Sequence, residues 1–297
     1  TAGEGGAPLA VAMGGAGAGG APDVLPPASC DPVVFPDGKL EAAIRTALDQ
    51  IGTITPDDMV SLKTLDADGY QVANLSGIEC FPELTELYLG VGGGASQVTD
   101  LSPLRYLTKL GRLDLSSNPL ESLEPLGELP SLQRLTLNNT SDALDYTPLS
   151  TAPALVRLDV QSNAQATLAP LANIATLREL WLNGSTFTAP TTLSALKQIE
   201  RLYVAGANLA DVAPLAALTQ LLDLDVSNNS ANLANFNQLS TLVNLTRLSA
   251  ESNGLIDITA VGSMIKLNYV DLYNNPITDI SALVNNAGIA AGDTVFV

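Results

Sequence analysis

Leucines spaced as LxxLxL recur about every 22 residues through most of this 297-residue chain. Ten such units follow one another over residues 62–283, and their first apolar residues lie 22 to 26 positions apart. Successive side chains of a strand point to opposite faces, so the motif places its leucines on one side of a short strand. No unit can bury these leucines alone, so neighbouring units must stack on one another. The sequence therefore predicts an α/β solenoid with a parallel sheet.

The residues after each LxxLxL carry a family resemblance. Phrases such as VTDLSPL (98–104), LADVAPL (209–215) and ITDISAL (277–283) follow the motif. An asparagine stands three positions after its last apolar residue in five units, at Asn118, Asn163, Asn229, Asn253 and Asn275. Over residues 37–297 these motifs resemble leucine-rich-repeat proteins, in particular the 22-residue bacterial internalin-like class. The resemblance implies a horseshoe or arc of about ten repeats with a concave parallel sheet and an N-terminal helical cap.

Several units depart from the asparagine pattern, among them those with Thr140, Ser185 and Ala207 at the equivalent position. A threonine or serine hydroxyl can still bond a turn backbone, whereas an alanine side chain cannot. We therefore expect the turn at Ala207 to use the neighbouring Asn208.

The chain divides into four segments. Residues 1–29 hold eight Gly, eight Ala and four Pro, a composition typical of a flexible arm or linker. Residues 30–61 are predicted to form the helical cap and residues 62–283 the repeats. Residues 284–297 are predicted to form a C-terminal cap or an edge strand.

The predicted cap contains two helices. Residues 37–52 read as an amphipathic helix that begins at Asp37 and ends at Gly52. A second short helix is expected to begin at Thr55 and Pro56. The apolar face of the first helix is predicted to comprise Leu40, Ile44, Ala47, Leu48 and Ile51.

Cys30 and Cys80 are the only cysteines of the chain. Cys30 precedes the cap and Cys80 lies in the return segment of the first repeat, so a disulfide between them would fasten the cap to the repeats. This bridge implies an exported, extracellular or cell-surface protein. The alternative is a pair of free buried thiols in a cytosolic protein.

Composition excludes several functions. Lys and Arg number 13 against 31 Asp and Glu, and a net charge of −18 disfavours nucleic acid or an anionic membrane as the main partner. The chain has no histidine, and its two cysteines cannot form a structural zinc site, so no metal is expected. The sequence contains no run of 18 apolar residues, the length needed to span a membrane. Because no nucleophile stands with a base, we expect neither enzymatic activity nor a cofactor.

The repeat register places a set of large polar and aromatic side chains on the outward, concave face of the strands. Such side chains suit a protein or glycan ligand, because Trp and Tyr supply contact area and Arg supplies directional donors. The alternative is that Arg and Asp on neighbouring strands only pair with each other in solvent. The candidate binding residues are Tyr88, Arg112, Arg134, Arg157, Trp181, Arg201, Tyr203, Arg247, Tyr269 and Tyr273.

The sequence thus favours a non-enzymatic secreted or surface module that binds a protein or glycan through its concave face. The alternative is a structural subunit of an extracellular filament or surface layer. Such a subunit would associate with its own copies through residues 1–29 and the open strand edge at residues 294–297.

Overall fold

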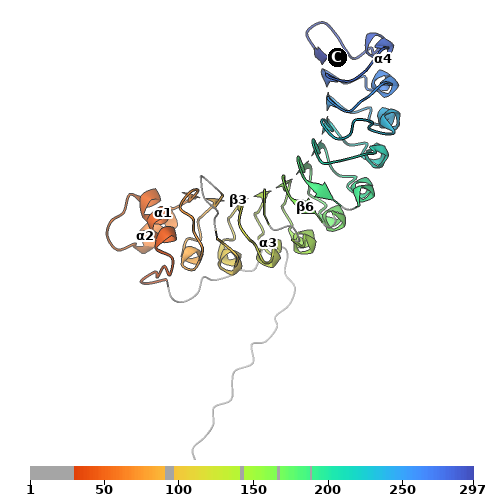
Figure 1. The fold of residues 1–297 in the computed structure, drawn as a ribbon. Helices are drawn as coiled ribbons and strands as arrows, with labels where there is room; N and C mark the ends of the chain where they lie inside the picture. Colours follow the sequence, from red (N-terminus) through yellow and green to blue (C-terminus); the bar gives the residue numbers. More distant parts are fainter. Residues whose placement is uncertain (1–29, 91–96, 141–143, 166–167, 188) are drawn as a thin grey trace, which may run out of the picture.

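The protein is a curved solenoid in which strands line the inner, concave side and short helical turns line the outer side (Figure 1). The computed structural model describes residues 30–90, 97–140, 144–165, 168–187 and 189–297. The predicted arm, residues 1–29, lies outside this part of the chain. The described residues confirm the predicted leucine-rich-repeat arc with a parallel concave sheet.

Eleven short strands form one parallel sheet, and neighbouring strands pair at equivalent positions of the repeat. A separate parallel pair joins β6 (Ala164–Gln165) to β8 (Thr186–Phe187). The strands of the main sheet are β1 (Thr64–Asp66), β2 (Glu86–Tyr88), β3 (Arg112–Asp114), β4 (Arg134–Thr136), β5 (Arg157–Asp159), β7 (Glu179–Trp181), β9 (Arg201–Tyr203), β10 (Asp223–Asp225), β11 (Arg247–Ser249), β12 (Tyr269–Asp271) and β13 (Thr294–Phe296).

The return segments on the outer side are single helical turns, mostly of the 3-10 type. Several carry proline as their second residue, and its fixed φ and missing N–H suit the first turn. They are η1 (Ile78–Cys80), η2 (Ser102–Tyr106), α3 (Glu124–Gly127), η3 (Thr147–Thr151), η4 (Ala169–Asn173), η5 (Pro190–Ala195), η6 (Ala213–Ala217), η7 (Phe236–Thr241), η8 (Thr259–Ser263) and α4 (Ser281–Val284).

The core is a continuous stack of aliphatic side chains between the sheet and these turns. The central leucines of adjacent strands pair directly, as Leu158 does with Leu180 and Leu180 with Leu202, and all three are fully buried. Burying one leucine side chain contributes about 1.5–3 kcal/mol. Because each leucine is covered by the next repeat, the stability belongs to the stack rather than to any single unit.

Asparagine side chains join the turns of neighbouring repeats. The Nδ2 group of Asn253 donates to the carbonyl of Val226 in the previous repeat and to that of Ala250 in its own, at 2.9 and 3.0 Å. Its Oδ1 accepts from the backbone N–H of Asn229 at 2.9 Å. Asn118, Asn163, Asn229 and Asn275 make the equivalent bonds, so these side chains replace backbone partners that the turn removes.

The turn at Ala207 differs from our expectation. Its backbone N–H is bonded by Oδ1 of Asn229, from the following repeat, at 2.9 Å. The same oxygen accepts from the N–H of Leu209 at 3.0 Å. Asn208 contributes instead through its backbone, which adopts a left-handed φ of 58°. The ladder therefore tolerates one alanine because each asparagine serves the repeat before it.

The N-terminal cap consists of α1 (Gly38–Leu48) and α2 (Pro56–Ser61). The Asp37 carboxylate accepts from the N–H of Lys39 at 2.8 Å and caps α1 as predicted. It also accepts from the N–H of Ala73 at 2.7 Å, which ties the cap to the first repeat. Thr55 caps α2 as predicted and forms a reciprocal capping box with Asp58.

The predicted apolar face of α1 was partly wrong. Leu40 and Ile44 are buried, but the third buried position is Ala43, whereas Ala47 and Ile51 are exposed. The helix ends at Leu48 rather than at Gly52 because Asp49 adopts the left-handed conformation, with a φ of 50°. A helical stripe cannot continue past that residue, so Ile51 points away from the core.

Cys30 and Cys80 form a disulfide, as predicted, with their Cα atoms 5.5 Å apart. The bridge closes a loop of 50 residues that contains the whole cap. Closing a loop of that length stabilises the folded chain by about 4 kcal/mol in the chain-entropy model. Few other contacts could hold so small a cap as firmly against the first repeat.

Replacing Asn253 with alanine tests the asparagine ladder. We expect the free energy of unfolding to fall by about 2 kcal/mol, since the N–H of Asn229 loses its acceptor in a buried turn. The carbonyls of Val226 and Ala250 keep bonds from Asn229 and Asn275, which limits the loss. Urea unfolding followed by circular dichroism measures it. Asn173→Ala, at an exposed position of η4, is the matched control and should change little.

Candidate binding face of the concave sheet

Two columns of outward side chains run along the concave sheet, because each three-residue strand has one buried central residue between two outward ones. Register fixes which residues are neighbours within a column. The first column reads Glu86, Arg112, Arg134, Arg157, Glu179, Arg201, Asp223, Arg247 and Tyr269. The second reads Tyr88, Asp114, Thr136, Asp159, Trp181, Tyr203, Asp225, Ser249 and Asp271.

The centre of this face is a three-layer stack. The guanidinium of Arg157 lies over the ring of Trp181, 4.3 Å from its centroid. The other neighbour of Trp181 is the ring of Tyr203, with centroids 4.0 Å apart and planes inclined by 30°. The Tyr203 hydroxyl donates to Oδ2 of Asp223 at 2.8 Å. Four successive strands thereby hold one preformed aromatic and cationic surface.

Two smaller stacks flank the centre. Arg112 lies over the ring of Tyr88 at 5.1 Å, and Arg247 lies over that of Tyr269 at 4.1 Å. Tyr269 also meets Phe296 of β13 edge to face, with centroids 6.2 Å apart. The sequence interpretation assigned Phe296 to the strand edge and omitted it from the binding face. Its place two residues after Thr294, in the alternation of an eleventh strand, was the signal that could have shown it.

Several arginines of the first column have a carboxylate of a neighbouring strand within ion-pair distance. Glu179 pairs with Arg201 and lies 4.0 Å from Arg157, and Asp223 lies 3.6 Å from Arg247. Arg201 and Arg247 therefore pair with carboxylates of neighbouring strands, while Arg157 and Arg247 also lie over aromatic rings, so ion pairing is not the only contact of these arginines. Among the described residues, Arg112 and Arg134 form no ion pair.

Burial shifts the pKa of several groups on this face. It raises the pKa of Tyr203 well above its usual range, and the hydrogen bond to Asp223 raises it further. Burial also raises the pKa of the Asp225 carboxyl, with Glu251 and Asp223 adding to the rise, although hydrogen bonds from Ser227 oppose it. Packing on this face therefore shields the Tyr203 phenol and the Asp225 carboxyl partly from water.

Trp181 carries a buried donor without an acceptor. Its indole Nε1 is inaccessible and has no hydrogen-bond partner within the described part of the chain. Leaving such a group unpaired costs about 1–3 kcal/mol. The stacking of Arg157 and Tyr203 on the ring must offset that cost for the arrangement to hold.

Tyr273 stands apart from the other candidates. It lies two residues beyond β12, and 63% of its surface is exposed. Within the described ranges it makes no ring contact. The structure thus brings together the other aromatic candidates with their arginines, but leaves Tyr273 as an isolated open ring at the C-terminal end.

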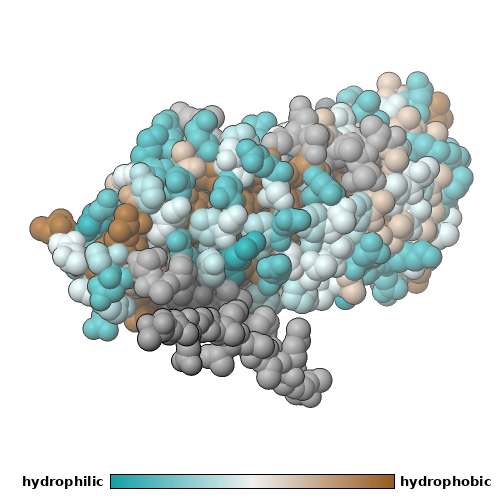
Figure 2. Space-filling view, turned by 90° about the horizontal axis from the view of Figure 1, so that it is seen from below, coloured by the Kyte–Doolittle hydropathy of each residue, from teal (hydrophilic) through white to brown (hydrophobic). Residues whose placement is uncertain are grey.

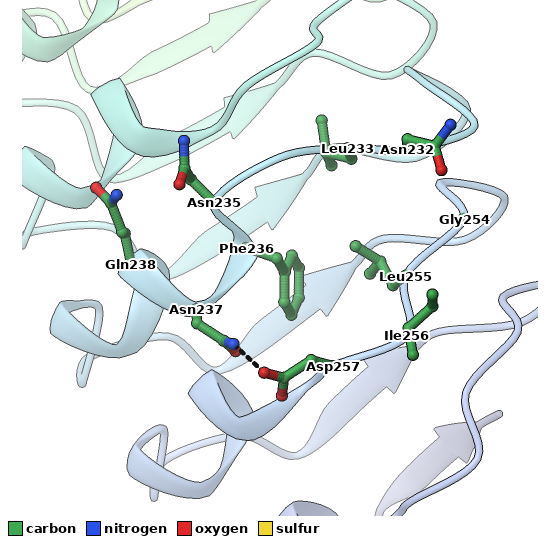
Figure 3. A pocket seen from close by; sticks show the side chains of 10 residues that line it. All are labelled: Asn232, Leu233, Asn235, Phe236, Asn237, Gln238, Gly254, Leu255, Ile256 and Asp257. Carbon is green, nitrogen blue, oxygen red and sulfur yellow. Dashed lines mark hydrogen bonds between the residues drawn. The ribbon is translucent and has the colours of Figure 1, made fainter.

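A hollow that the sequence did not indicate lies on the flank between the strands and the outer turns (Figure 3). It measures about 430 Å³ and joins the segments before η7 and η8. Asn237 bonds Asp257 across it, while Leu233, Phe236 and Leu255 form its apolar part. Nothing in the LxxLxL pattern marks this hollow, because it arises from the longer repeat that contains Asn232.

No group of three or more acidic, cysteine or histidine side chains within the described ranges is arranged to hold a metal ion. In the same part of the chain, no helix is long and apolar enough to cross a bilayer.

Comparisons with known proteins agree with the repeat geometry. A family model described as Leucine Rich repeats (2 copies) matches residues 243–285. The solved functional domain of InlJ from Listeria monocytogenes is 20% identical, covering 85% of this chain and 63% of its own, with a TM-score of 0.57. A leucine-rich-repeat protein of Leptospira interrogans is 19% identical, covering 79% of this chain and 72% of its own, with a TM-score of 0.56.

Internalin C2 of Listeria monocytogenes is 29% identical, with 86% of this chain and 92% of that chain covered and a TM-score of 0.46. A search of the curated proteins finds no match. The repeat register, the family match and the structural neighbours identify the chain as a leucine-rich-repeat protein with an internalin-like fold. This fold is typical of modules that bind protein partners, and leucine-rich-repeat proteins are generally non-enzymatic.

The stack predicts an optical titration. We expect the phenol of Tyr203 to ionise well above pH 10 and to quench the adjacent Trp181, the only tryptophan of the chain. The stability that the neutral phenol contributes is complete below about pH 10 and is lost as the pH rises further.

Emission recorded against pH, with circular dichroism to confirm folding, measures this titration. Asp223→Asn should move the midpoint down toward the ordinary tyrosine value, and Tyr203→Phe should abolish this step. A wild-type midpoint at or below pH 10 would contradict the assignment.

Proposed function

We propose that this chain is an exported module that binds a protein partner through the concave face of its sheet. The observation that supports the proposal is the series of arginine–aromatic stacks on that face, centred on Arg157, Trp181 and Tyr203. Tryptophan, tyrosine and arginine are the residues that most often dominate the affinity of protein interfaces. Here they are held in place before any partner arrives, which lowers the entropy cost of association.

The covering of the aromatic ring faces favours a protein over a glycan as the ligand. A sugar stacks on an open ring face, yet Arg157 and Tyr203 take up the faces of Trp181. Arg112 covers Tyr88, and Arg247 covers Tyr269. These composite surfaces present ring edges, guanidinium donors and carboxylates side by side. That mixture matches the polar and apolar patchwork of a protein surface.

Export is supported by the Cys30–Cys80 disulfide, because such bonds persist in oxidising compartments and are rare in the cytosol. An extracellular or cell-surface location therefore accords with the chemistry that holds the N-terminal end together.

A panel of purified extracellular protein domains provides the test of binding. We expect a partner whose affinity falls about 30-fold or more in a Trp181→Ala/Tyr203→Ala double variant, because the central stack is lost. Surface plasmon resonance measures the affinities.

An Ile256→Ser/Ile265→Ser variant is the matched control, since both isoleucines are exposed away from the concave sheet. It should bind like the wild type. The proposal fails if partners bind the concave double variant unchanged or lose affinity equally for the control. Thermal unfolding of every variant verifies that the fold is intact.

Self-association remains a second candidate, favoured by exposed apolar side chains at the two ends of the described solenoid. Hydrophobic surface is prominent at both ends in the view of Figure 2. At the C-terminal end Val295, Phe296 and Val297 of the β13 region are exposed along the edge of the sheet. An open strand edge can pair with another chain.

Light scattering coupled to size-exclusion chromatography distinguishes this candidate. Self-association predicts oligomers that grow with protein concentration and disappear in a Phe296→Asp variant, because a charge at this edge opposes stacking. A wild-type chain that stays monomeric over the whole concentration range would refute it. The concave-face proposal is independent of that result.

A further inference from the structure

We propose that Arg112 and Arg134, with Arg157 beside them, form a carboxylate-binding site that receives a short acidic segment of the protein partner. The proposal deepens the function proposed above and rests on it, since it names the chemistry that the partner must present. It concerns the half of the concave face nearer the cap, on strands β3, β4 and β5.

Register brings the three arginines together. Arg112 pairs with Arg134, and Arg134 with Arg157, at the same position of consecutive strands. Neighbouring strands lie about 4.8 Å apart, so the backbones of the three arginines span about 10 Å, with the guanidinium of Arg112 turned toward Tyr88 and that of Arg157 toward Trp181. Like charges directly opposite each other destabilise a sheet. A bound carboxylate would relieve that repulsion, because each guanidinium can offer two parallel N–H donors to it.

Arg112 and Arg134 differ from the other arginines of the column because neither forms an ion pair among the described residues. Arg201 pairs with Glu179, and Arg247 lies 3.6 Å from Asp223. Within the described ranges, the guanidinium of Arg134 makes no hydrogen bond, ion pair or ring contact, and that of Arg112 lies over the ring of Tyr88. Both side chains are exposed and can therefore reach a ligand.

The carboxylates near the site are committed to other groups. Glu86 accepts from the hydroxyl of Tyr88 at 2.7 Å, and Asp114 accepts from the N–H and hydroxyl of Ser116 at 2.9 and 2.6 Å. Asp159 accepts from Gln161 at 2.9 Å and lies 3.5 Å from Arg157. None of the three lies within ion-pair distance of Arg112 or Arg134.

A groove of about 250 Å³ opens beside these two arginines. Gly111 leaves a gap in its lining where the next repeat carries the larger Gln133. A methyl group on Gly111 would meet the backbone oxygens of Ser131 and Thr85 at no less than 3.6 Å. The absence of a side chain there is therefore not a packing requirement, and it leaves room for a ligand side chain.

The charges around the site select a short acidic segment rather than a long polyanion. Glu86 borders the arginine run on one side, and Glu179 and Asp223 follow on the other. A sulfated glycan or nucleic acid that filled the arginines would continue over these carboxylates and be repelled. At physiological salt, charges beyond about 8 Å are largely screened. The local arginines therefore outweigh the overall charge of −18 for a ligand confined to this site.

Trp181 provides the readout, because it is the only tryptophan and Arg157 lies 4.3 Å from its ring. The probe is an acetylated, amidated peptide of alternating Gly and Glu with three glutamates, compared with its Gln counterpart. We expect the Glu peptide to change Trp181 emission saturably in the full chain at low salt, and the Gln peptide to leave it unchanged. The change should weaken as NaCl is added.

Three variants assign the site. Arg134→Gln and Gly111→Gln should each weaken Glu-peptide binding about tenfold. The first removes a guanidinium, and the second fills the groove with a side chain. Arg178→Gln removes an arginine that lies outside both columns and is already 3.4 Å from Glu200, so it should bind within about twofold of the wild type. Thermal unfolding confirms that each variant is folded.

Four results would overturn the proposal. These are an absence of Glu-peptide binding, equal binding of the Gln peptide, equal weakening by Arg178→Gln, and binding of a heparin hexasaccharide in place of the Glu peptide. A panel partner that needs Trp181 and Tyr203 but ignores Arg134→Gln would also overturn the carboxylate site, and it would leave concave-face binding intact. Conversely, peptide binding that passes these controls in the absence of any panel partner would support the site alone.

Discussion

The hydrogen bonds of the buried asparagines set the spacing on which the rest of the molecule depends. Each side chain bonds a carbonyl of its own turn and one of the previous repeat, as Asn253 does with Ala250 and Val226. The backbone can then leave the strand after three residues without orphaned polar groups. This keeps the central leucines of successive strands in register. Aliphatic burial supplies most of the stability, but the asparagines fix the geometry in which that burial occurs.

The same register places equivalent outward side chains of successive repeats next to one another, in columns on the sheet. A residue beside the central leucine has as its neighbours the equivalent residues of the repeats before and after it. Arg157 and Tyr203 are 46 positions apart along the chain, yet they form one stack with Trp181 between them. A change at one outward position therefore alters an ion pair or a ring contact on two adjacent strands, while the leucine core beneath stays the same.

Much of this could be predicted from the sequence because the period is strict. The strand register and the outward placement of Trp181 follow from spacing, and the positions of Cys30 and Cys80 beside the cap favoured the bridge over free thiols. The end of α1 did not follow from spacing, since the left-handed backbone at Asp49 is a local choice that no pattern announces. Nor did the sequence show which arginines pair: Arg134 and Arg247 occupy the same column, but only Arg247 has a carboxylate within reach. Pairing depends on rotamers and on which carboxylates are already bonded.

The loop closed by Cys30 and Cys80 makes the two ends of the described solenoid differ in how firmly they are held. A stack held only by nearest-neighbour contacts loses its order from the ends inward. One end of the described solenoid is tied by a covalent bond, whereas β13 is held at the other by its pairing with β12. The repeats beside the cap should therefore resist this loss of order longest in an oxidising compartment. The arginines of β3 and β4 would be among the last parts of the face to lose their shape.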